Sequence, residues 1–349
     1  MRIATLMSYA AGFKKASEEI AELEKAGLDV AFVPEAYSFD APTAMGYLAA
    51  KTKSLTIASG IIPIYTRTPT LLAMTAAGLD SLSDGRAMLG LGAGGPQVME
   101  GFHGVPFTSP TARLREIIEI CRKVWKREEK LVHDGKIYQV PSRQDQGTGL
   151  GIPLKLINHP VRNDIPITIA SLGQKSVELT AEAADGWLPA FYVASQAKNI
   201  WGDALARGLA KRDPNRAPLE IFSGGGVGIG EGLEHLRDMG RPQTALYVGG
   251  MGARGKNFYN DIFSRAGYEK EAAEIQDLYL SGKKAEAEAA IPKEFFDKTS
   301  LIGPEGFVRD RLAELKESGV TSLNVGFVGH TMEERLSQCE NLRSIVDNL

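Results

Sequence analysis

The sequence has little cysteine and histidine, and this scarcity limits the chemistry that it can support. Of its 349 residues, two are cysteines and five are histidines. Cys121 and Cys339 lie in segments with a helical pattern, which favours free thiols in a reducing compartment over a disulfide bond. The histidines lack the spacing of a metal site, and the sequence has no C-x-x-C pair and no G-x-S-x-G nucleophile turn. We therefore expect no bound metal and no serine hydrolase.

A strong net charge and long apolar runs are also missing. The formal net charge is −3, with 24% charged and 43% hydrophobic residues, which is an ordinary globular composition. Without an excess of basic residues, we expect no binding to nucleic acid. No segment approaches the roughly 20 apolar residues that span a bilayer, and the apolar N-terminal run is too short for a signal peptide. The composition therefore predicts a cytoplasmic protein that does not associate with membranes.

Strand and helix patterns alternate regularly over the first hundred residues. Short apolar runs bounded by turn residues predict strands, and amphipathic segments between them predict helices. This alternation indicates βαβ units in a parallel sheet whose faces are covered by helices. The predicted strands are residues 3–8, 30–33, 55–62 and 87–91, and the helices are residues 13–26, 42–51 and 70–82.

The same alternation continues to the C-terminus with interruptions. The predicted order is a loop at 92–110, a helix at 111–130, a hairpin at 131–140, a loop at 141–164, then strands at 165–170, 185–189, 219–229 and 323–328 with helices at 174–184, 195–211, 304–318 and 332–349. We expect one domain over residues 1–349, with insertions near 92–110, 131–164 and 251–300. The pattern and length favour a (β/α)8 barrel, and a doubly wound open sheet is the alternative.

Two glycine-rich segments match nucleotide-binding patterns only in part. Gly90 to Gly95 fits G-x-G-x-x-G, but it follows the fourth strand, and Pro96 with a long loop replaces the expected helix. We interpret these glycines as a place where the backbone approaches a flat ligand closely. Residues 250–257 resemble a P-loop, except that Asn257 stands where a hydroxyl would bind magnesium. We interpret Lys256 as a solvated cation or one that faces the substrate.

A third segment has the pattern of an anion site. Residues 169–176 end a strand in small residues, turn at a glycine and begin a helix. Free N–H groups and the helix dipole favour an anion there, and Lys175 adds a positive charge. The alternative is an ordinary turn with a surface lysine. In a barrel, such loops commonly hold a cofactor phosphate.

Seven segments spread over most of the chain carry a resemblance to a known family. Together they resemble the luciferase-like flavin and deazaflavin family, and they are most similar to the branch that uses coenzyme F420 and includes methylenetetrahydromethanopterin reductase. They are residues 27–35, 59–69, 83–92, 170–175, 184–187, 302–304 and 319–320. The resemblance implies a (β/α)8 barrel, often as a homodimer.

The resemblance also implies where the cofactor binds. A non-prolyl cis peptide between Gly60 and Ile61 would lie under its central ring. Ala93 and Gly94 would line the cofactor tail. The phosphate-binding turn would consist of Ser171, Leu172, Gly173, Gln174 and Lys175.

The family's acidic position after the second strand falls on Glu35, which we expect to act in catalysis by polarising the ring or the substrate. Ala36 follows it, whereas many deazaflavin relatives have a histidine there. Tyr65 and Arg67 are candidates for holding an anionic substrate group, or they are surface loop residues. His159, with Arg162, is a further candidate to face the site.

These implications predict an oxidoreductase that transfers a hydride between reduced F420 and a small substrate with an unsaturated, carbonyl or imine group. One alternative is an FMN-dependent monooxygenase on the same barrel. The other is a protein that binds deazaflavin without catalysis.

Overall fold

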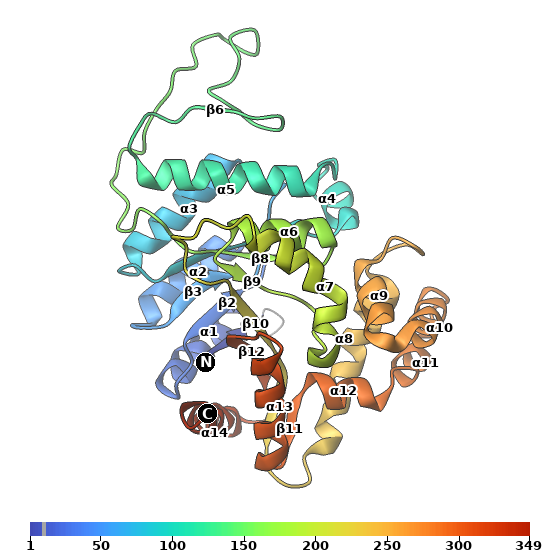
Figure 1. Cartoon of the computed structure of the whole chain (residues 1–349). Coiled ribbons are helices and arrows are strands. Elements are labelled where there is room, and N and C mark those ends of the chain that lie inside the picture. Colours follow the sequence, from blue (N-terminus) through green and yellow to red (C-terminus); the bar gives the residue numbers. More distant parts are fainter. Residues whose placement is uncertain (9–11) are drawn as a thin grey trace.

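Eight strands close into a parallel ring in the computed structural model, which describes residues 1–8 and 12–349 (Figure 1). The first strand, β1, pairs with both β2 and β12, and β9 pairs with β10, so among the described residues the ring is closed. The structure is thus the predicted (β/α)8 barrel, and the open sheet is excluded. In order around the ring, the strands are β1 (Arg2–Leu6), β2 (Val30–Val33), β3 (Thr56–Ser59), β5 (Ala87–Gly92), β8 (Ile167–Ala170), β9 (Gly186–Trp187), β10 (Glu220–Ile229) and β12 (Ser322–Phe327).

Helices surround this ring, and their starts have clear causes in the sequence. At the start of α3, the Thr68 hydroxyl accepts a hydrogen bond from the backbone N–H of Leu71, and Pro69 occupies the first turn. At the start of α14, Thr331 and Glu334 form a capping box. The surrounding helices are α1 (Phe13–Lys25), α2 (Ala41–Lys51), α3 (Pro69–Leu82), α5 (Pro110–Lys126), α6 (Gln174–Ala183), α7 (Ala194–Leu209), α13 (Glu305–Glu317) and α14 (Met332–Asp347).

The third strand is not the single continuous run that we predicted from the sequence. It is divided into β3 and the short β4 (Ile62–Pro63), and β5 pairs with both parts. The peptide bond between Gly60 and Ile61 is cis, as the resemblance implied. The break therefore falls at the position predicted to lie under the cofactor ring.

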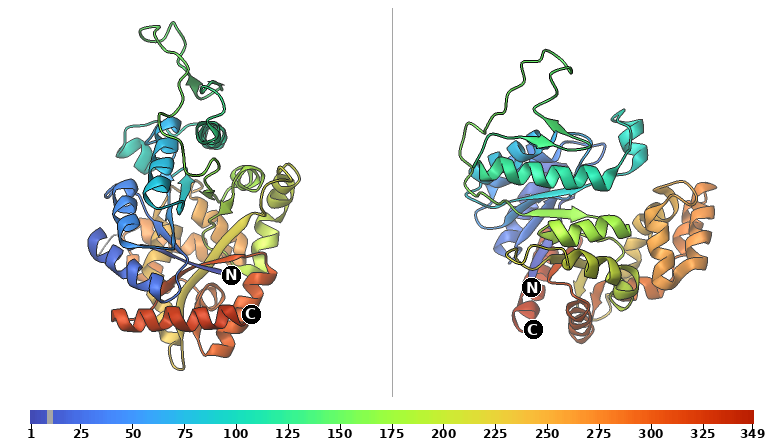
Figure 2. Two further views of the ribbon diagram at one scale, coloured as in Figure 1. Left: turned by 90° about the vertical axis from the view of Figure 1, so that its left-hand side faces the viewer. Right: turned by 45° about the horizontal axis from the view of Figure 1, so that its top comes forward.

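Two further predictions are corrected between β5 and β8. The predicted loop at 92–110 contains a short helix, α4 (Pro96–Gly101). The following helix ends at Lys126 rather than at residue 130, because Arg127 adopts a left-handed conformation with φ 54°. The predicted hairpin is confirmed, with β6 (His133–Asp134) antiparallel to β7 (Gln139–Val140). The loop that follows it projects away from the barrel in both views of Figure 2.

A helical region separates β10 from the short strand β11 (Leu301–Gly303), which pairs with β10. It begins at residue 234, earlier than the predicted insertion, and it forms the yellow and orange group beside the barrel in Figure 1. Its elements are η1 (Glu234–Gly240), α8 (Arg241–Ala245), η2 (Leu246–Gly250), α9 (Phe258–Phe263), η3 (Ser264–Tyr268), α10 (Glu269–Leu280), α11 (Lys284–Ala289) and α12 (Lys293–Thr299).

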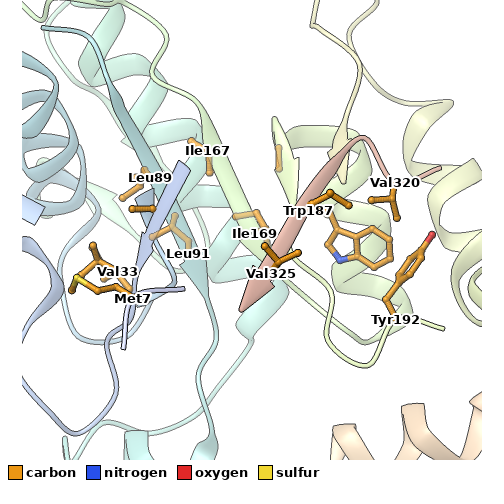
Figure 3. Packing of buried hydrophobic residues seen from close by; sticks show 14 of the residues in the cluster. Met7, Val33, Leu89, Leu91, Ile167, Ile169, Trp187, Tyr192, Val320 and Val325 are labelled. Carbon is orange, nitrogen blue, oxygen red and sulfur yellow. The ribbon is translucent and has the colours of Figure 1, made fainter. Parts of the chain in front are cut away.

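The hydrophobic core has two layers that follow from the alternation of side chains along each strand. The larger layer fills the space between strands and helices. In Figure 3 it includes Leu91 of β5, Ile169 of β8 and Trp187 of β9. The smaller layer fills the barrel interior and consists of Ala4, Val30, Phe32, Ala58, Met88 and Phe222. This inner layer is the floor on which the candidate site rests.

Candidate active site

Above the inner layer, most of the residues that line the barrel interior are small. The inward positions nearest the carboxyl ends of five strands or strand extensions are Leu6, Gly60, Gly92, Ala170 and Gly326, which we call the barrel mouth. Leu6 is 46% exposed there. A Cβ atom added at Gly326 would meet no atom within 4 Å. The barrel mouth is therefore open, at the end of the fold where α/β barrels carry their active sites.

Gly90 allows close contact between two strands, not the contact with a ligand that we expected. Its backbone N–H donates to Ser59 Oγ at 2.9 Å, and Ser59 Oγ in turn donates to the Gly90 carbonyl at 2.8 Å. A Cβ at Gly90 would lie 1.7 Å from the Ser59 carbonyl oxygen. Gly92 is similar, because a Cβ there would lie 3.0 Å from Ile61 Cδ1. These glycines hold β5 against the divided third strand.

Ala93 and Gly94 lie beside the predicted phosphate turn. Gly92 is in register with Ala170, so the residues that follow β5 and β8 leave the barrel side by side. Gly94 has a φ of 69°, which turns the chain out of β5 toward α4. The structure therefore brings these two groups of predicted cofactor residues together, although they are more than 70 residues apart in the sequence.

Two indole groups fix the backbone of the turn after β8. Trp187 Nε1 donates to the Ser171 carbonyl at 3.0 Å, and Trp201 Nε1 donates to the Leu172 carbonyl at 2.9 Å. The buried Ser171 hydroxyl lies 2.9 Å from Thr180 Oγ1. The carbonyls of Ser171 and Leu172 and the Ser171 hydroxyl are thus all bonded within the protein. The Ser171 side chain therefore holds the turn in place.

The first turn of α6 has no side-chain cap. Gly173 is the N-cap residue, and no side chain among the described residues caps this turn. Gln174 does not provide a cap, because its Nε2 donates to the Ile200 carbonyl at 2.6 Å. The Lys175 side chain is exposed. The turn thus combines unpaired backbone donors, the positive end of a helix dipole and a nearby ammonium group, all of which favour an anion.

Glu35 and Arg67 form a partly buried ion pair, which corrects the expectation for Arg67. The two guanidinium nitrogens lie 2.5 and 2.9 Å from the two carboxylate oxygens of Glu35. The backbone N–H of Ala41 also donates to Glu35, at 2.8 Å. The side chains of Arg67 and Glu35 are 15% and 7% exposed. Because Glu35 neutralises its charge, Arg67 is not a free cation for an anionic substrate.

Tyr65 is also not the surface residue that we considered. It is buried, and its hydroxyl donates to the Thr108 carbonyl at 2.9 Å. The Arg113 guanidinium lies 4.9 Å from the centre of its ring. Burial raises the pKa of the Tyr65 hydroxyl. Since this hydroxyl is already bonded, Tyr65 supports the wall of the site and does not present a polar group to a substrate.

His159 and Arg162 lie at the opposite end of the barrel from the barrel mouth. Arg162 pairs with the buried Asp80 and donates to the carbonyl of Ala87, the first residue of β5. Earlier in the same loop, the Leu156 carbonyl accepts from Arg127 just after α5. The exposed His159 lies between these two anchors. The expectation that this loop faces the site is therefore wrong.

The sequence analysis missed a polar residue on the inner face of β12. Asn324 is in register with Ala4 on one side and Gly224 on the other. Its Oδ1 is buried and has no hydrogen-bond partner among the described residues. The sequence does contain a sign of this residue's role, because an asparagine between Leu323 and Val325 interrupts an apolar strand. The amide is thus available to a molecule bound in the barrel mouth.

The P-loop-like segment forms a structural turn. The Asn257 side chain accepts from the backbone N–H groups of Tyr259 and Asn260 and so caps α9. Its amide nitrogen donates to the Tyr247 carbonyl at 2.9 Å. Both hydrogen-bonding sides of Asn257 are therefore used within the protein.

Comparisons with known proteins agree with this geometry. The model of the luciferase-like monooxygenase family matches residues 1–322. The chain belongs to this family. A protein of Mycobacterium tuberculosis, provisionally named a coenzyme F420-dependent oxidoreductase, is 41% identical over 312 residues, which cover 88% of this chain and 89% of that protein. The 5,10-methylenetetrahydromethanopterin reductase of Archaeoglobus fulgidus is 26% identical over 312 residues, with coverage of 87% and 86%.

Two solved enzyme structures have the same fold as this chain. The F420-dependent tetrahydromethanopterin reductase from Methanopyrus kandleri superposes with a TM-score of 0.79 at 20% identity and covers 100% of this chain and 98% of its own. A Baeyer-Villiger monooxygenase of Pseudomonas putida in complex with FMN superposes with a TM-score of 0.67 at 18% identity, with coverage of 99% and 97%. Family membership and the named relatives make this chain an oxidoreductase. In the part of the chain that the structure describes, no helix has the length and apolarity needed to cross a bilayer.

Proposed function

We propose that this oxidoreductase uses coenzyme F420 to transfer a hydride to or from a small substrate that carries an unsaturated, carbonyl or imine group. The observation that carries the proposal is the 41% identity, over most of both chains, to a relative named for F420. The open barrel mouth beside the uncapped α6 supports it, because the two together suit a flat ring with an anionic tail.

The residues of the site fit such a cofactor in shape and charge. The space over Gly326 and the exposed side chain of Leu6 leave room for a flat ring above the inner layer. We propose that Ala93, Gly94 and residues 171–175 line the tail, because they leave the barrel side by side. A phosphate at the start of α6 would gain about 0.3–1 kcal/mol from the helix dipole at an exposed site.

Each residue of the site then has a limited and definable task. When bound, the deazaflavin supplies or accepts the hydride. Gly60 and Ile61 form the wall under its ring. Glu35 is fixed by Arg67 and by the Ala41 N–H, so we propose that it positions the ring or the substrate. Ala36 cannot exchange a proton, so proton transfer in this chain does not use a histidine at that position.

An FMN-dependent monooxygenase is the second candidate, favoured by the fold shared with an FMN-bound enzyme. The two candidates differ in the cofactor that binds. We expect purified protein to bind F420 and not FMN in equilibrium fluorescence titrations. We also expect reduced F420 to be consumed with at least one member of a panel of enones, imines and ketones. Tight binding of FMN together with no binding of F420 would contradict the proposal.

A pair of matched variants tests the position of the site. Gly326→Leu fills the open space of the barrel mouth, and Gly306→Leu adds the same side chain at an open, exposed position on α13. We expect Gly326→Leu to lose F420 binding while both variants keep the wild-type circular dichroism spectrum. Equal binding by the two variants would place the cofactor elsewhere.

A further inference from the structure

Aromatic side chains gather at one side of the barrel mouth, on segments that follow three different strands. Phe13 follows β1, Tyr37 and Phe39 follow β2, and Phe102 follows β5 and α4. We call these four residues the aromatic rim. Tyr37, Phe39 and Phe102 are 68%, 71% and 66% exposed, respectively. Exposed aromatic groups of this size are costly to leave in water, and a cluster of them marks a binding surface.

The rim residues contact one another across the loops. The rings of Phe13 and Phe39 lie 5.8 Å apart at an interplanar angle of 68°. The rings of Tyr37 and Phe102 lie 6.3 Å apart at 53°. The loop after β2 therefore contributes one ring to each of two aromatic pairs, one with Phe13 at the start of α1 and one with Phe102 at the end of α4.

The loop that carries Tyr37 and Phe39 is fixed to the candidate site. The Glu35 carboxylate at its start accepts from the N–H of Ala41 at its end, and the same carboxylate is held by Arg67. Beside this loop, at the end of β1, the Leu6 side chain is exposed on the inner face of the barrel. Exposed apolar side chains thus occur both at the barrel mouth, at Leu6, and on the rim.

The rim and the α6 turn approach the barrel mouth from different strands. The order around the ring is β1, β2, β3, β5 and β8, so β3 and β5 separate the loop after β2 from the turn after β8. With the anionic tail of the cofactor at α6, Tyr37 and Phe39 of the rim border the part of the barrel mouth that remains for the substrate, and Phe102 reaches Tyr37 from the β5 side. The charge of Arg67 on this side is cancelled by Glu35, so this pair offers no attraction to an anionic substrate.

We propose that the substrate is uncharged and carries an aromatic or similarly flat apolar group, which packs against Tyr37 and Phe102 of the rim. This inference rests on the proposed hydride transfer for the reacting part of the substrate. The inference adds the chemical class of the substrate group that does not take part in hydride transfer. Flat rings pack edge-to-face or offset against such side chains, and this gives selectivity over small aliphatic groups.

Two aldehydes with the same reacting group test the proposal. Cinnamaldehyde and crotonaldehyde are both enals and differ by a phenyl in place of a methyl group. We expect the wild-type protein with reduced F420 to favour cinnamaldehyde in kcat/KM by at least about tenfold. The double variant Tyr37→Ala/Phe102→Ala should lose this preference mainly through a higher KM for cinnamaldehyde. Tyr47→Ala, at a tyrosine on the outer helix α2, is the matched control and should keep the preference.

A binding measurement separates this inference from the proposed reaction. Ligand-observed NMR compares cinnamyl alcohol with crotyl alcohol on the same three proteins, with and without F420. Selective binding of cinnamyl alcohol that the double variant loses supports the rim even if no aldehyde is turned over, in which case the reaction fails alone. Equal binding of the two alcohols by the wild type, or a preference that survives in the double variant, overturns the rim as a substrate surface.

Discussion

At Gly90, a single hydrogen atom in place of a side chain lets two strands meet. The Ser59 hydroxyl bonds to both the N–H and the carbonyl of Gly90. We expect Gly90→Ala to destabilise the protein by about 3 kcal/mol or more, because the added methyl group overlaps backbone atoms that cannot move away independently. Urea unfolding measures this change.

A second glycine on a neighbouring element provides the control. Gly78 is exposed on α3, and an added Cβ would meet no atom within 4 Å. Gly78→Ala should stabilise the protein by about 0.5–1 kcal/mol, because alanine has the higher helix propensity. Similar unfolding midpoints for the two variants would show that the contact with Ser59 has no energetic weight.

Asn324 offers a second test at the scale of one residue. A buried acceptor without a partner costs about 1–3 kcal/mol, so its retention in an apolar strand indicates a use in the bound state. Asn324→Leu should leave the ligand-free protein as stable as the wild type or more so, and should weaken F420 binding. Thermal unfolding and a cofactor titration check both parts. A large loss of stability without ligand would mean that the amide serves the fold.

At the scale of elements, one carboxylate of α5 holds the hairpin. Glu116 accepts from the backbone N–H groups of residues 136–138 and lies 3.3 Å from His133 Nε2. Burial alone raises the pKa of Glu116, but these backbone hydrogen bonds and the contact with His133 outweigh it and hold the pKa below its usual 4.5. The ionised carboxylate is therefore the form that attaches the hairpin.

The sign of this shift predicts how the stability depends on pH. Because the pKa is lower in the folded protein, the Glu116 contribution is complete above pH 4.5 and is lost as the pH falls through the folded value. We expect Glu116→Gln to be less stable than the wild type at neutral pH, with a difference that shrinks below pH 4.5. Glu119→Gln, at an exposed position on the same helix, should show little difference at any pH. Urea unfolding across this pH range measures the three proteins.

At the scale of the whole molecule, the loop after the hairpin exposes many apolar side chains. The loop itself projects away from the barrel (Figure 2). A group of exposed apolar residues of this size is typical of a protein interface. The most exposed are Leu150, Ile152, Leu154, Ile157 and Val161. We propose that this loop contacts a second copy of the chain in a homodimer.

The dimer can be tested without knowledge of the substrate. We expect light scattering after gel filtration to give the mass of two chains. The double variant Leu150→Ser/Ile157→Ser should shift the protein toward one chain at micromolar concentration. Leu280→Ser, at another exposed leucine on α10, should remain dimeric. A wild-type protein that runs as one chain would contradict the proposal.

Local patterns in the sequence are enough to predict the alternation of strands and helices and the glycine turn after β8, and the resemblance of short segments locates the cis peptide. These features depend on the order of residues within a short segment. The folded chain alone reveals that Glu35 neutralises Arg67, that Gly90 bonds to Ser59 and that the loop of His159 lies at the far end of the barrel. Each of those facts depends on which distant segments the closed ring brings together. A charged or small residue reveals its role only through the partner that it meets in the fold.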